Sequence, residues 1–275
     1  MQADPKKDAV ATLFNQVSTL YDCEATRFFT FCGERLVNVV KPEAGTKLLD
    51  VATGTGAVAV PMAQAIGPEG RVTGIDLSAG MLGKAEANIK KIGLNNIDLF
   101  EMDAENLDFN DASFDSVVCS YGLFFMPDML AALQEWRRVV RPAGKVVFTS
   151  FETTAFQPMM DGFLEKMAAT GVDVPTGRFG SHLIESVEHC RQLLQQAGLE
   201  NINVHTAQLG YHLANEADWW TIVTNTAMRH LLEKIPADRQ EQFRVEHLDF
   251  VKSQMSTEGL WLDVDTRFAV GHRPA

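Results

Sequence analysis

One stretch decides the fold: Lys47-Leu48-Leu49-Asp50-Val51-Ala52-Thr53-Gly54-Thr55-Gly56. Its first half is a short apolar run typical of a buried strand, and its second half is a glycine-rich turn that leads into the helical run 58–66. Glycines let the backbone turn sharply and approach a ligand closely, while free N–H groups at the start of the next helix face that ligand. The stretch therefore predicts a strand, a ligand-binding loop and a helix in succession.

The alternation of strand and helix continues toward the C-terminus. The pattern predicts further strands at 71–75, 97–102, 114–120 and 145–151, with helices at 79–91 and 129–140. Such alternation specifies right-handed crossovers and a parallel sheet with helices on both faces. The predicted class is therefore α/β.

The two flanks of this region have a different character. Two helices, 9–20 and 24–40, precede it, and Pro42 closes the second. After Phe151 the pattern predicts helices at 158–169, 187–197, 216–233 and 237–255, and strands at 201–211 and 260–270. We expect one structural domain in three parts: N-terminal helices (1–42), a ligand-binding core (43–151), and the remaining strands with helical insertions that form a lid (152–275).

The charge, the apolar runs and the cysteine spacing of the sequence exclude several kinds of binding partner. The 275 residues carry a net charge of −12, from 24 Lys+Arg against 36 Asp+Glu, so a polyanion is repelled, and neither nucleic acid nor an anionic membrane is an expected partner. The chain has no apolar run of the roughly 20 residues that span a bilayer, and its start has no signal-peptide core, so we expect a cytoplasmic location. The four cysteines are scattered without C-x-x-C spacing, which predicts reduced thiols and no metal site.

Two carboxylates bear on the cofactor. Asp76 ends the second strand about 20 residues beyond the glycines, where a carboxylate accepts both ribose hydroxyls. A nicotinamide-dinucleotide site would share this residue, and 54–59 also fits its looser G-x-G-x-x-A form. Asp103, at the end of the third strand, is placed to accept from an adenine amino group, which a dinucleotide site does not require.

Five ordered motifs carry a family resemblance from residue 45 to about 151. They are 50–56, 74–78 with Met81-Leu82, 102–105, 113–118 and 133–145. Together they resemble the class I S-adenosylmethionine-dependent methyltransferases. The chain is most similar to the ubiquinone/menaquinone-biosynthesis methyltransferase group, through Phe14-Asn15, Tyr21-Asp22, Ala52 in place of a first glycine, and Tyr121-Gly122-Leu123.

This resemblance implies a Rossmann-like, seven-stranded, mostly parallel sheet with the last strand antiparallel, and S-adenosylmethionine as the cofactor. The loop after the first strand would hold the methionine end, Asp76 the ribose, and Asp103 with the Ala104 N–H the adenine. The residues expected to bind the cofactor are Tyr21, Asp50, Ala52, Thr53, Gly54, Gly56, Asp76, Leu77, Met81, Asp103, Ala104 and Ser120.

The acceptor side departs from common patterns. Many small-molecule O-methyltransferases have a histidine after the fourth strand, where this chain has Phe124-Phe125. The expected substrate-pocket residues are Tyr121, Phe124, Phe125, Met159, Trp219, Trp220 and His230. Ordinary core packing, or a solvated helix face for His230, is the alternative. His182, in an expected loop, is the candidate catalytic base, with a surface histidine as its alternative.

The sequence thus predicts a methyltransferase, monomeric or homodimeric, that methylates oxygen, nitrogen or carbon of a small, largely apolar organic acceptor. Two other functions remain open: a regulatory module that binds the cofactor without turnover, and a nicotinamide-dependent oxidoreductase.

Overall fold

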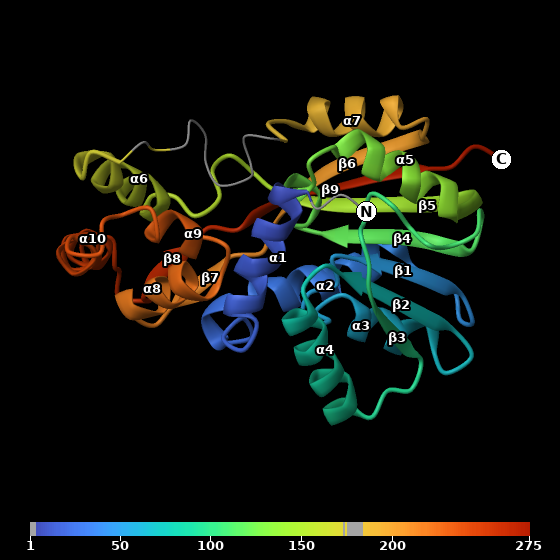
Figure 1. The fold of residues 1–275 in the computed structure, drawn as a ribbon, viewed down its shortest axis with the longest axis horizontal. Helices are drawn as coiled ribbons and strands as arrows, with labels where there is room; N and C mark the ends of the chain where they lie inside the picture. The colour runs from blue at the N-terminus through green and yellow to red at the C-terminus, as the bar shows by residue number, and fades with distance from the viewer. Residues whose placement is uncertain (1–3, 173, 175–183) are drawn as a thin grey trace.

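The computed structural model describes residues 4–172, 174 and 184–275, and a seven-stranded sheet forms its largest layer (Figure 1). The strand order is β3-β2-β1-β4-β5-β9-β6. Strands β1 to β5 pair in parallel, and β9, the last in the chain, runs antiparallel to both neighbours. The predicted class and the antiparallel last strand are confirmed. The strands are β1 (Lys47–Val51), β2 (Arg71–Asp76), β3 (Ile97–Glu101), β4 (Phe114–Ser120), β5 (Val140–Phe151), β6 (Glu200–Gln208) and β9 (Asp265–His272).

Helices cover both faces of the sheet, which is why side chains on both faces of β1 are buried: Leu48, Leu49 and Val51 are at most 1% exposed. One face packs against α2 (Phe28–Val40), α3 (Ala59–Ile66) and α4 (Ala79–Ile92), and the other against α5 (Met129–Val139) and α7 (Val187–Gln196). The strand order reverses between β1 and β4. Open α/β sheets bind ligands at such a reversal, outside the carboxyl ends of the strands.

Helix α1 (Pro5–Val17) runs in front of that edge in Figure 1. Asp4 caps it by accepting from the Lys6 N–H, and Pro5 occupies its first turn. Asn15 Oδ1 accepts from the Ser78 hydroxyl and the Gly80 N–H, both at 2.8 Å. The helix is thereby docked on the start of α4.

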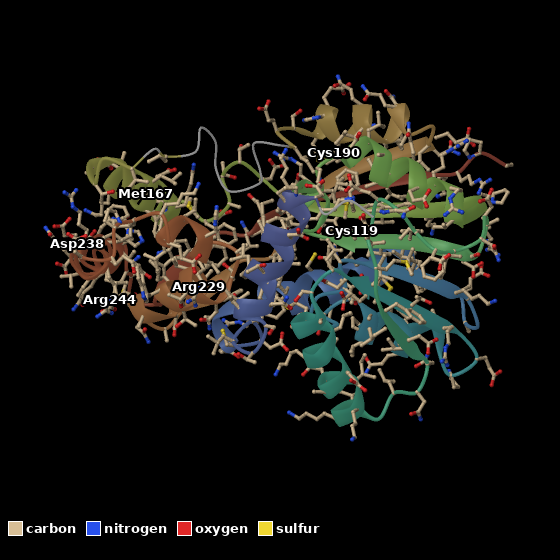
Figure 2. All side chains as sticks on the ribbon, in the orientation of Figure 1. Cys119, Met167, Cys190, Arg229, Asp238 and Arg244 are labelled. Atoms are coloured by element: carbon tan, nitrogen blue, oxygen red, sulfur yellow. The ribbon has the colours of Figure 1, made fainter. Side chains whose placement is uncertain are left out.

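A helical module projects beyond the sheet, at the left of Figure 1. It comprises α6 (Met159–Ala169), α8 (Glu216–Asn225), α9 (Arg229–Leu232), α10 (Gln240–Ser253), and a two-stranded sheet of β7 (Tyr211–Leu213) and β8 (Leu260–Leu262). Figure 2 shows Met167, Arg229 and Arg244 in this module, and Cys119 and Cys190 in the sheet half. The four cysteines are free in the structure.

Three elements predicted as continuous are interrupted, and β5 begins at Val140 rather than at 145. The predicted strand 201–211 is β6 followed by β7, and 260–270 is β8 followed by β9. At the first break a Cβ on Gly210 would lie 2.3 Å from the Leu262 carbonyl oxygen, so the backbones approach too closely for a side chain. The predicted helix 216–233 breaks at Thr226, whose backbone is extended. None of the described helices is long and apolar enough to span a bilayer.

Candidate functional site

A cavity lies at the carboxyl ends of β1 to β5. The space it encloses, its open mouth included, is about 1260 Å³. The loops that follow these five strands line it, together with α1, residues of 21–29 and the turn 226–228. The cavity lies over the reversal of strand order between β1 and β4, which is where open α/β sheets bind their ligands.

The glycine loop after β1 forms one wall. Ala52 and Gly54 have φ of 53° and 55°, in the left-handed region, and the Thr53 N–H donates to the Ile75 carbonyl at 2.9 Å. An added Cβ on Gly54 would meet nothing within 4 Å. This backbone therefore faces open space, where a ligand can approach it closely.

Asp76 fixes the geometry of this wall. Its Oδ2 accepts from the Gly54 N–H and its Oδ1 from the Ser78 N–H, both at 2.9 Å. Burial raises the pKa of this carboxyl above its usual value, against the effect of these backbone donors. Asp76 lines the cavity with Leu77 and Met81 beside it, so an acidic group and apolar side chains share one end.

Asp103 lies at the same end, and a lysine from α1 reaches it. Lys7 Nζ donates to Asp103 Oδ2 at 2.7 Å and forms a second, shorter ion pair with Glu105. Burial lowers the pKa of this ammonium, but the hydrogen bonds to Asp103 and Glu105 outweigh it and raise the pKa overall. Helix α1 is thus held over the end of β3 by charge.

Two of the expected cofactor residues lie behind the wall. Asp50 is 2% exposed, and the Thr53 hydroxyl donates to its Oδ2 at 2.6 Å. Burial raises its pKa to about 7. Gly56 faces α4, where an added Cβ would lie 3.7 Å from that of Ala85. The other ten expected cofactor residues line the cavity.

The end of the cavity near β4 and β5 is aromatic. Nine rings line the cavity: Phe14, Tyr21, Phe28, Phe29, Tyr121, Phe124, Phe125, Phe151 and Phe156. Tyr21 stacks on Phe29 with centroids 4.7 Å apart, and Phe14 meets Phe125 edge-on at 5.2 Å. Among the described lining residues the charged side chains are Lys7, Asp76, Asp103 and Glu105, which all follow β2 or β3 or come from α1. The cavity therefore has a charged end and an aromatic end.

Tyr121 anchors the aromatic end. Its ring stacks on Phe151 at 4.1 Å, and its hydroxyl shares a 2.6 Å hydrogen bond with Thr266 of β9. Its φ is 52°, a conformation that L side chains rarely adopt. The backbone strain is offset by this bond and by the 3.1 Å bond from the Tyr121 N–H to Thr149.

Of the expected pocket residues, Tyr121, Phe124 and Phe125 line the cavity and four lie elsewhere. Met159 and Trp219 are fully buried in the helical module, and Trp220 packs near Phe243 in the same module. His230 is exposed on α9. These four positions are those of ordinary packing or of a solvated helix face. His182 lies outside the described residues.

Sequence reasoning left several lining residues unassigned, among them Lys7, Phe28, Phe156 and the turn 226–228. A lysine on an N-terminal helix carries no local signal for a pairing across 96 residues. The aromatic pair Phe28-Phe29 is the signal that the sequence offers, because two adjacent rings at the start of a helix supply apolar surface, and both line the cavity.

The site fits an adenosine-containing cofactor on two observations. Gly54 presents unobstructed backbone, and the acidic groups Asp76 and Asp103 stand at successive strand ends along the charged end. The carboxylates can accept from the hydroxyls of a ribose and from the amino group of an adenine, to which the backbone can also donate. The ring faces favour a positively charged group.

Comparison with known proteins agrees with this geometry. The model of the ubiE/COQ5 methyltransferase family matches residues 2–214. Aklanonic acid methyltransferase DauC from Streptomyces sp. (strain C5) is 39% identical over 150 residues, which are 54% of this chain and 68% of that protein. A demethylmenaquinone methyltransferase from Bacillus cytotoxicus is 34% identical over 163 residues, 58% of this chain and 67% of that protein.

A solved structure shares the fold. Phosphoethanolamine N-methyltransferase 2 from Haemonchus contortus, in complex with S-adenosyl-L-methionine, superposes with a TM-score of 0.62 at 15% identity, covering 100% of this chain and 61% of that one. At that identity the likeness concerns the fold alone.

Proposed function

Since this chain belongs to the ubiE/COQ5 methyltransferase family, and is thus an S-adenosylmethionine-dependent methyltransferase, we propose that it methylates a compact, largely apolar aromatic molecule. The observation that carries this proposal is the division of one cavity into a charged end and an aromatic end. Each end matches one of two reactants, and the glycine loop, which follows β1, lies between the ends of β2 and β4.

The charged end holds the cofactor in this proposal. Asp76 takes the ribose hydroxyls, Asp103 and the Ala104 N–H take the adenine, and Leu77 and Met81 pack beside the base. The backbone of 52–54 and Ser120 contact the methionine end, while Asp50 acts through Thr53, whose hydroxyl it orients. Bound S-adenosylmethionine supplies an electrophilic methyl group on a positively charged sulfonium.

The chain's own contribution to the reaction is mainly positional. Methyl transfer requires the two reacting atoms to be aligned at near-attack distance, with water excluded. The rings of Tyr21, Phe29 and Tyr121 exclude water from the aromatic end. Aromatic faces also favour a nearby positive charge by roughly 0.5–2 kcal/mol.

The same walls define the acceptor. At the aromatic end, the described lining residues offer rings and hydroxyls but neither a histidine nor a carboxylate. We therefore propose an acceptor that brings its own nucleophile, such as an acidic hydroxyl or a carboxylate on an aromatic ring. Relatives named aklanonic acid methyltransferase and demethylmenaquinone methyltransferase support a small organic acceptor. Proton removal by His182 stays a prediction, as do a cytoplasmic location and a monomeric or dimeric state.

Two measurements test the proposal. In calorimetry with S-adenosylhomocysteine, Asp76→Asn should weaken binding about tenfold or more, because two backbone donors and the ribose lose a charged acceptor. The exposed Asp108→Asn is the matched control and should bind as the wild type does. Incubation with S-adenosylmethionine and a panel of hydroxylated and carboxylated aromatics should yield products heavier by one CH₂. Unchanged affinity in Asp76→Asn contradicts the cofactor assignment, and a panel without product contradicts the acceptor class.

A further inference from the structure

The break between α8 and α9 places three residues in the cavity wall. Thr226 is extended, with φ −118° and ψ −176°, and its hydroxyl donates to the Ile222 carbonyl at 2.8 Å. The same hydroxyl accepts from the Met228 N–H at 3.3 Å. Thr226, Ala227 and Met228 are 5%, 5% and 3% exposed, and all three line the cavity. We call these residues the 226–228 turn.

The 226–228 turn is held against the segment of the chain that contains the lining residue Tyr21. Asn225 Nδ2 donates to the Leu20 carbonyl at 3.0 Å, and α8 packs against the 3₁₀ helix Glu24–Thr26. Leu20 directly precedes Tyr21, one of the lining rings. The 226–228 turn therefore keeps a defined position relative to the aromatic end.

Buried packing also stabilises this wall from behind. The lining ring of Phe156 lies 6.4 Å from the Trp219 ring of α8. The Trp219 indole N–H donates to His247 Nε2 of α10 at 2.7 Å, with both residues 0% exposed. Because α8 is held by this bond, the turn that follows it cannot withdraw without disturbing a buried hydrogen bond.

The turn differs from the rest of the cavity in one respect. Every other lining residue falls between Lys7 and Phe156, inside the matched range 2–214, whereas the 226–228 turn lies beyond it. The cavity is thus completed by a segment that lies outside the part of the chain matched to the family.

We propose that Met228 is a specificity-determining residue, which closes the aromatic end and selects a compact acceptor over one that carries a long apolar chain. The inference rests on the proposed function, because it assigns the aromatic end to the acceptor. A chain attached to the acceptor ring gains about fourfold in affinity for each methylene that finds buried apolar space. Met228 lines the cavity and is 3% exposed, so its side chain occupies space that a long chain would need.

The test is binding of 2-methyl-, 2-pentyl- and 2-decyl-1-naphthol to protein saturated with S-adenosylhomocysteine, followed by quenching of tryptophan fluorescence. The wild type should bind the methyl compound best and the decyl compound worst. Met228→Ala should improve binding of the decyl compound about tenfold and leave the methyl compound within about twofold. Met228→Leu, with similar volume, should behave as the wild type does. Met255→Ala, a methionine of the same module that does not line the cavity, is the matched control.

Two results would overturn the inference: a wild type that binds the decyl compound as tightly as the methyl one, or an alanine variant that changes all three affinities equally. Met228→Val, which removes less buried volume, replaces the alanine variant if that one unfolds. Methyl transfer is measured separately. If the naphthols bind in the predicted order but none is methylated, the proposed acceptor chemistry fails and the role of Met228 stands. If none binds, the role of Met228 fails, while calorimetry of the cofactor still tests the proposed function.

Discussion

The ammonium group of Lys7 donates a 2.7 Å hydrogen bond to the carboxylate of Asp103, and so joins the first turn of α1 to the end of β3. The same ammonium pairs with Glu105. Helix α1 buries little of itself, since Val17 is its one buried residue. Its position over the charged end therefore depends on this ion pair, on the contacts of Asn15 and on the packing of Phe14 against Phe125.

Replacing Lys7 by Met should accelerate dissociation of S-adenosylhomocysteine and weaken its binding about three- to tenfold, because α1 loses a partly buried, charge-assisted contact. The difference between variant and wild type should shrink as salt screens the ion pair. Stopped-flow displacement at two ionic strengths measures both effects. Lys6→Met, on the exposed side of the same turn, is the control. A slower dissociation in Lys7→Met would show instead that Lys7 competes with the cofactor for Asp103.

Asp50 makes stability depend on pH. Its pKa is about 7 in the folded protein, raised by burial, against a usual value of 3.8. Between these values the folded chain holds a proton that the unfolded chain has released, so this group's contribution to stability falls as pH rises from about 4 to 7, by up to about 1.4 kcal/mol per pH unit. Asp50→Asn should remove that slope. Urea unfolding of the ligand-free protein at several pH values tests this, with the exposed Asp249→Asn as the control.

Gly122→Ala should disturb the glycine loop. An added Cβ would lie 2.8 Å from the Ala52 Cβ and 2.7 Å from the Cys119 Sγ, closer than real Cβ contacts allow. We expect about tenfold weaker binding of S-adenosylhomocysteine, because Ala52 must shift. Gly83→Ala on α4, where a Cβ would meet nothing within 4 Å, should bind as the wild type does. In the double variant Gly122→Ala/Ala52→Gly, part of the affinity should return because one of the two clashes is removed. If the affinity does not recover, the clash with Cys119 is the one that weakens binding.

His247 should make the helical module sensitive to acid. Burial lowers its pKa to about 3 from the usual 6.5, so it stays neutral and accepts from Trp219. As pH falls below 6.5 the unfolded chain takes up a proton that the folded chain does not, and stability declines by up to about 1.4 kcal/mol per pH unit. His247→Gln keeps an acceptor but does not titrate in this range. Its loss of stability between pH 7 and pH 5, measured by urea unfolding, should therefore be smaller than in the wild type. His230→Gln, at an exposed site, should retain the wild-type slope.

The sequence predicted the fold, and the position of Asp76 and Asp103 at strand ends, because both depend on local patterns. Apolar runs and glycines locate the strands, and a carboxylate at a strand end, such as Asp76, is brought to the cavity by the topology alone. The pairing of Lys7 with Asp103 joins segments far apart in sequence, and no periodicity records it. The break at Thr226 was missed because 216–233 has no glycine or proline to interrupt a helical pattern. Trp219 and Trp220 were expected in the pocket, but their hydrophobicity is explained equally well by the interior of the module, where the structure places them.

The close approach at Gly210 has a consequence for the length of the segment that follows it. Tyr211 and Leu262 face each other as paired residues of β7 and β8, so the segment between them leaves and re-enters at adjacent points. A segment with such closely spaced ends can be lengthened, shortened or exchanged at small cost in closure entropy, and the register of β6 on β9 is unaffected. Residues 211–262 thus leave the sheet and return to it at one point, and they carry the 226–228 turn of the cavity wall.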